Sequence, residues 1–146
     1  MNEICVYCED DATDALIPKG KQSSRPESYS CFYTRTTGIW QTVWLEFLPE
    51  EYIDSAKYYA DINEPAVTVC AELRGKADFS AEVFYEGELM GSYKACNVSG
   101  TLNFTIRLAK KYLWEVGNGR LYDIKFKFGN DEVQSYFGLR QVRIDG

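Results

Sequence analysis

The residues most able to bind a ligand lie in one short run, residues 33–46, which reads YTRTTGIWQTVWLE. Trp40, Trp44 and Tyr33 could stack on the C–H face of a sugar ring, and Arg35 could donate hydrogen bonds beside them. On a strand, Trp40 and Trp44 share one side, which suits burial against a neighbouring sheet equally well. We favour packing for the two indoles, and sugar contact stays open as the alternative.

Several kinds of catalysis are excluded or weakly supported. The chain contains no histidine, so Ser-His and Cys-His mechanisms are excluded. Cys5 and Cys8 have the spacing that begins a zinc or redox site, but no second pair follows at a suitable distance. In an extended strand these two side chains also point to opposite faces. No metal or cofactor is expected.

Composition narrows the classes of partner. The chain has 146 residues and a net charge of −6, which disfavours nucleic acid and anionic membranes because both require a basic surface. No apolar run is long enough to span a bilayer, and the first residues lack a signal-peptide pattern. Five cysteines form an odd set, and reduced thiols in the cytoplasm are the expected state.

Apolar and polar residues alternate through most of the chain after Pro49, which predicts an antiparallel sheet with one buried face. About seven short strands in this space favour a β-sandwich of immunoglobulin type. The strands are expected at residues 52–62, 67–73, 79–85, 89–95, 102–108, 122–128 and 133–144. A further strand is predicted at residues 41–47, and residues 108–116 are interpreted as an irregular crossover, although their apolar spacing also suits a short helix.

Three motifs occur in an order that resembles one enzyme family. The first is PKGKQ at residues 18–22, followed by residues 33–46. The second pairs Leu113-Trp114 with LYD at residues 121–123, and the third is SYFGLR at residues 135–140. Together they resemble family 2 glycoside hydrolases, the β-galactosidase and β-glucuronidase relatives.

The resemblance implies a division of the chain. Residues 1–48 would be the C-terminal remnant of a sugar-binding-type jelly-roll domain, and residues 49–146 an immunoglobulin-like β-sandwich. The catalytic barrel would follow the chain, with the two carboxyl groups that a retaining glycosidase requires. Glu64 sits in an Asn-Glu-Pro sequence that imitates the acid of such barrels, but Asn and Pro are ordinary turn residues here.

The expected function is therefore that of a non-catalytic segment, inactive alone, which spaces and buttresses the barrel. Its partners would be the barrel and the rest of the jelly roll. Arg35, Trp40 and Arg140 are the candidate sugar or interdomain contacts, although Phe32 replaces the acidic residue that some relatives carry before the turn glycine. The alternative is a free-standing carbohydrate-binding module that uses the Trp40 face.

Overall fold

The computed structural model describes residues 3–11, 13–14, 16–142 and 144. The chain divides into two compact units, and the boundary falls between Glu46 and Phe47. We call the unit before this boundary the N-terminal unit and the unit after it the sandwich. None of the described segments forms a helix that is long and apolar enough to cross a membrane.

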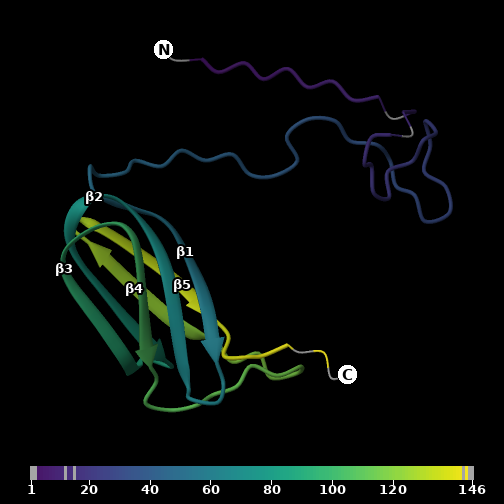
Figure 1. Ribbon diagram of the computed structural model, residues 1–146. Helices are drawn as coiled ribbons and strands as arrows, with labels where there is room; N and C mark the ends of the chain where they lie inside the picture. Colours follow the sequence, from purple (N-terminus) through teal and green to yellow (C-terminus); the bar gives the residue numbers. More distant parts are fainter. Residues whose placement is uncertain (1–2, 12, 15, 143, 145–146) are drawn as a thin grey trace. The chain divides into compact units, whose positions relative to one another are not determined.

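The sandwich contains five antiparallel strands, which Figure 1 shows in chain order. They are β1 (Tyr52–Asp61), β2 (Ala66–Tyr85), β3 (Glu88–Arg107), β4 (Tyr122–Phe128) and β5 (Asp131–Phe137). The turn between β2 and β3 holds Glu86 and Gly87, whose φ angles are 49° and 83°. Two central residues with positive φ match the right-handed twist of the strands, so this turn favours a long hairpin.

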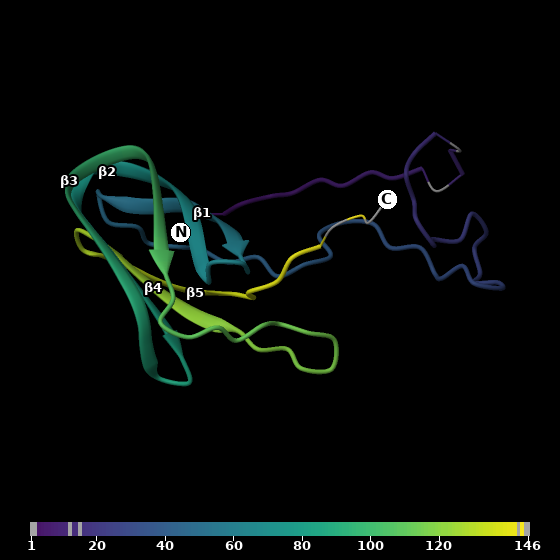
Figure 2. The same ribbon diagram turned by 60° about the horizontal axis from the view of Figure 1, so that its bottom comes forward.

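The β2–β3 hairpin bends at its middle, and the bend divides the sheet into two layers (Figures 1 and 2). The first part of β2 lies between β1 and the end of β3, with Val67 opposite Ile106. The last part of β2 lies between β4 and the beginning of β3, with Ala81 opposite Phe126. Strand β5 completes the second layer by pairing with β4.

Backbone geometry explains where the hairpin bends. The pairing of β2 with β3 changes register between Leu73 and Ala77. Gly75 has a φ of 86°, and on the facing strand Asn97 and Gly100 have φ angles of 56° and 69°. Residues with positive φ interrupt a regular ladder and let the strands turn from one layer into the other.

The predicted all-β antiparallel sandwich is confirmed. The bend makes two segments of each long strand, so five continuous strands supply the seven segments that the alternating pattern indicates. One boundary differs from the prediction, because β5 ends at Phe137 and does not continue to residue 144. Beyond it, Leu139 pairs in parallel with Leu113 of the crossover.

The core lies between the two layers and is built from the alternate residues of each strand. Phe79 is at its centre, with ring centroids 5.3 Å from Phe104 and 5.9 Å from Phe126. Phe79 is only 2% exposed, and most of its neighbours are as deeply buried. The buried set confirms the predicted inner faces: Val67, Val69, Ala71, Leu73, Ala81, Val83, Ile106, Ile124 and Phe128.

The two ends of β3 approach each other closely because the strand bends and each half lies in a different layer of the sandwich. A methyl group built on Gly91 would collide with the carbonyl oxygen of Arg107 and lie 2.7 Å from a methyl of Ile106. Just past β3, the amide of Ala109 donates to the carbonyl of Met90. Only glycine therefore fits at position 91.

The N-terminal unit contains no named strand among its described residues, so the strand predicted at residues 41–47 is wrong. Within residues 3–11, 13–14 and 16–46, sheet-like pairing is limited to two isolated bridges, Gln22 with Tyr33 and Tyr29 with Phe32. A strand requires a neighbour to satisfy its backbone groups, and the described part of this unit supplies none for that run.

Candidate interdomain contact site

The crossover between β3 and β4 returns to the end of β5 and forms a compact aromatic site. Trp114 donates its backbone N–H to the carbonyl of Leu139 at 3.1 Å. Gly138 lies against the same indole, and a Cβ added there would be 3.3 Å from the Trp114 Cβ atom. The Arg140 guanidinium lies over the Trp114 ring, 4.9 Å from its centroid. We call Trp114, Gly138 and Arg140 the indole–arginine site.

Glycine is suited to position 138 for a simple reason. The crossover packs closely on the chain after β5, and a side chain at position 138 would press against Trp114. Figures 1 and 2 both show the crossover and the C-terminal segment leaving the sandwich at the same end. The second and third sequence motifs, which are separate in the chain, therefore meet in this site.

Tyr122 anchors the crossover from the side of the core. Its side chain is fully buried, and its hydroxyl accepts the N–H of Tyr112 at 2.7 Å and donates to the carbonyl of Lys110 at 2.9 Å. Burial raises the pKa of the Tyr122 phenol, because the charged form would lose its hydration. The Tyr112 ring also stacks on Tyr85 at 4.0 Å.

This hydrogen-bonded tyrosine resembles the tyrosine corner of immunoglobulin sandwiches, where a tyrosine near the start of a strand bonds to the backbone upstream. In the sequence, Tyr122 belongs to the second motif, but the motif does not predict this role. The position of Tyr122 at the first residue of β4, after a long irregular crossover, is the feature that could have predicted it.

Arg35 and Trp40 belong to the N-terminal unit, whereas Trp114, Gly138 and Arg140 belong to the sandwich. Arg35 lines a polar hollow of about 400 Å³ together with Asp10, Pro26, Thr34 and Thr37.

Trp40 and Trp44 are 82% and 70% exposed, and their packing against a neighbouring sheet stays a prediction. The Trp44 indole N–H donates to Glu46.

The remaining candidates from the sequence have ordinary surroundings. Glu64 lies in the turn between β1 and β2, as predicted, where its carboxylate is 3.7 Å from Arg107. Cys5 and Cys8 are exposed thiols. No group of three or more His, Cys, Asp or Glu side chains that could hold a metal ion occurs among the described residues.

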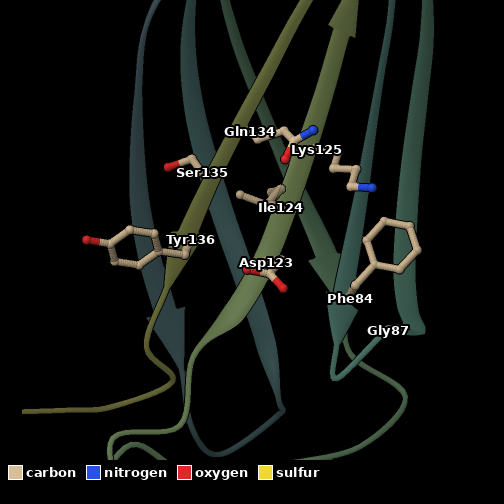
Figure 3. A pocket seen from close by; sticks show the side chains of 8 residues that line it. All are labelled: Phe84, Gly87, Asp123, Ile124, Lys125, Gln134, Ser135 and Tyr136. Atoms are coloured by element: carbon tan, nitrogen blue, oxygen red, sulfur yellow. The ribbon is translucent and has the colours of Figure 1, made fainter.

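A second feature, absent from the sequence predictions, lies on the outer face of the second layer. A shallow groove of about 520 Å³ lies over β2, β4 and β5. Figure 3 shows the side chains that line it. Phe84 and Tyr136 lie on opposite sides of Asp123, and Lys125 and Gln134 lie beside them. We call these five residues the outer groove. Its residues are distant in sequence, and strand pairing alone brings them together.

The fold is an all-β antiparallel sandwich whose long crossover is anchored by Tyr122. No family model and no curated protein matches the chain. Solved structures do, and they confirm the predicted resemblance to the β-glucuronidase relatives.

The apo β-glucuronidase of Ruminococcus gnavus is 28% identical over 68% of this chain, with a TM-score of 0.55. The same enzyme with uronic deoxynojirimycin gives 28% identity, 68% coverage and a TM-score of 0.56. The chain covers 18% of each of these proteins, so it spans less than a fifth of their length.

Proposed function

We propose that the chain is a non-catalytic segment of a family 2 glycoside hydrolase, in which the sandwich spaces and buttresses the catalytic barrel. The observation that carries this proposal is the indole–arginine site. It joins two of the three motifs at the end of the sandwich where the chain leaves toward residue 146. The resemblance to β-glucuronidases supports the same assignment.

The site is suited to supporting a neighbouring domain because its residues are already held in position without a partner. Trp114 is fixed by its backbone bond to Leu139 and by contact with Gly138. Arg140 is exposed, and its planar guanidinium can donate several hydrogen bonds while one face remains on the indole. A barrel docked here would bury the half-exposed indole and accept hydrogen bonds from the arginine.

The chemical step would take place in the barrel. Retaining glycosidases hydrolyse an O-glycosidic bond with two carboxyl groups about 5 Å apart, one as nucleophile and one as acid and base. The parent protein would perform this reaction, and the present chain would give no turnover by itself. Residues 1–48 would be the tail of the jelly roll, and the observed boundary after Glu46 supports that division.

The proposal is tested by reading the gene beyond the codon for Gly146. We expect the open reading frame to continue into a barrel that carries two catalytic carboxylates. A stop codon shortly after Gly146, with no barrel encoded, would contradict the proposal. Hydrolysis of a nitrophenyl glucuronide by the purified chain alone would contradict it as well.

A second candidate is a free-standing carbohydrate-binding module, which the exposure of Trp40 favours. Titration with galactosides and glucuronides, followed by tryptophan fluorescence, tests it. Saturable quenching that Trp40→Ala abolishes would support this function. An unchanged emission spectrum, or equal quenching in the variant, would remove it.

A further inference from the structure

The outer groove is built on three neighbouring strands. Phe84 pairs with Asp123, and Asp123 pairs with Tyr136, so these three residues form one row across β2, β4 and β5. Glu82, Lys125 and Gln134 form the adjacent row. Neighbouring strands lie about 4.8 Å apart, so the row from Phe84 to Tyr136 is about as wide as two pyranose rings.

The polar side chains of the groove are not used within the sandwich. Asp123, Lys125 and Gln134 make no side-chain hydrogen bond or ion pair to any described residue. Lys125 instead lies over the Phe84 ring, with its ammonium 5.2 Å from the centroid. These groups remain available to a ligand.

The outer face of the other layer provides the contrast. There the polar side chains bond to each other across strands, at distances of 2.8 to 3.0 Å, in the pairs Thr68–Thr105, Thr101–Glu72 and Arg74–Asp54. On the outer face of the second layer, Lys127 and Glu132 form a similar pair at 2.9 Å. The outer groove differs from all of these pairs, because its polar side chains have no such partner among the described residues.

We propose that the outer groove binds a neutral saccharide of one or two rings. Asp123 and Lys125 are its charged lining residues, and Glu82 lies next to Lys125 on the same face, so carboxylates outnumber the ammonium and an anionic ligand is disfavoured. A carboxylate accepts, an ammonium donates and an amide does both, and sugar hydroxyls match all three. Phe84 supplies an apolar surface for the C–H face of a ring, and Tyr136 lies on the opposite side of Asp123 (Figure 3).

The size of the groove agrees with this ligand. Small-molecule sites usually have volumes of about 300–1,000 Å³, and the groove is within that range at about 520 Å³. The groove is shallow and solvent-facing, so the affinity is expected to be weak, with a Kd on the order of 1 mM. The groove shares no residue with the indole–arginine site, and the inference does not depend on the function proposed above.

The test is an NMR titration of the full ¹⁵N-labelled chain with lactose, cellobiose and glucuronic acid. We expect saturable shifts for the two neutral disaccharides, confined to amides of β2, β4 and β5 around the groove. Glucuronic acid should bind more weakly. Asp123→Ala and Tyr136→Ala should each weaken disaccharide binding about tenfold or more, a loss of about 1.4 kcal/mol.

Tyr59→Ala is the matched control. Tyr59 is 59% exposed on β1, and Tyr136 is 65% exposed on β5, so both substitutions remove an exposed phenol from an outer face. The control should bind as the parent chain does. Shifts that map elsewhere, tighter binding of glucuronic acid, or no saturable shift up to about 50 mM sugar would overturn the inference.

Discussion

The sandwich and the N-terminal unit contain similar fractions of apolar residues but bury them differently. The sandwich buries its aromatic and branched side chains between two layers. In the N-terminal unit the only buried side chain among the described residues is Ser23, and large apolar groups such as Ile4, Leu16 and Trp40 face solvent. Apolar content alone therefore does not produce a core.

The contrast lies in strand pairing. Each strand of the sandwich has a partner, and the partner fixes which face points inward. The N-terminal unit relies on local polar contacts, such as the Ser23 hydroxyl donating to the carbonyl of Glu27 and Arg25 lying 4.1 Å above the Tyr29 ring. Such contacts shape a loop but supply little stability against its conformational entropy.

The largest difference in stability is expected when one aromatic residue from each region is replaced by alanine. Phe79→Ala should lower the free energy of unfolding by about 3–5 kcal/mol, because it leaves a cavity at the centre of the core. Trp40→Ala removes a larger side chain but should change stability by less than about 0.5 kcal/mol, because that ring is exposed. Urea unfolding of both variants checks this, and equal losses would show that the N-terminal unit shares the core.

An intermediate effect is expected at the anchor of the crossover. Tyr122→Phe leaves the N–H of Tyr112 and the carbonyl of Lys110 without their partner, so it should cost about 1–3 kcal/mol. Tyr136→Phe is the control, because its exposed hydroxyl makes no hydrogen bond to a described residue. Thermal unfolding measures both, and matching midpoints would show that the Tyr122 hydrogen bonds contribute nothing.

The smallest effect is a dependence of stability on alkaline pH. Burial raises the pKa of Tyr58 above its ordinary value of 10.0, because the charged phenolate would lose its hydration. The unfolded chain then loses the Tyr58 proton at lower pH than the folded chain does. Stability is therefore complete below pH 10 and falls as pH rises toward the folded pKa.

Unfolding in urea at a series of pH values above 9 measures this slope. Tyr58→Phe should flatten it, whereas Tyr59→Phe, at the exposed neighbouring position, should leave it unchanged. An identical slope in Tyr58→Phe would contradict the assignment.

Much of the sandwich could be predicted from the sequence. Alternation such as Val67, Val69, Ala71 and Leu73 specifies a buried face, and the turn at Gly129 separates two strands, because these signals are local. The continuity of β2 through Gly75 could not be predicted, because it depends on how the facing strand bends.

The candidate functional sites were harder to predict from the sequence, because they depend on contacts between residues that are distant in the chain. Trp114 and Arg140 each belong to a predicted motif, but their stacking follows from the path of the crossover. The outer groove likewise arises from the pairing of Phe84, Asp123 and Tyr136. The strand predicted at residues 41–47 failed for the opposite reason, since its pattern is suitable but the described chain offers no partner.

Native-state hydrogen exchange of the full chain, followed by mass spectrometry, tests the central claim most directly. The central claim is that the sandwich is a complete folding unit with its own core and that the N-terminal unit is not. We predict that amides of residues 16–46 exchange fully before those of residues 102–107 begin, because strand amides at the core open only with global unfolding. Protection in residues 33–46 as strong as that in residues 102–107 would contradict the account.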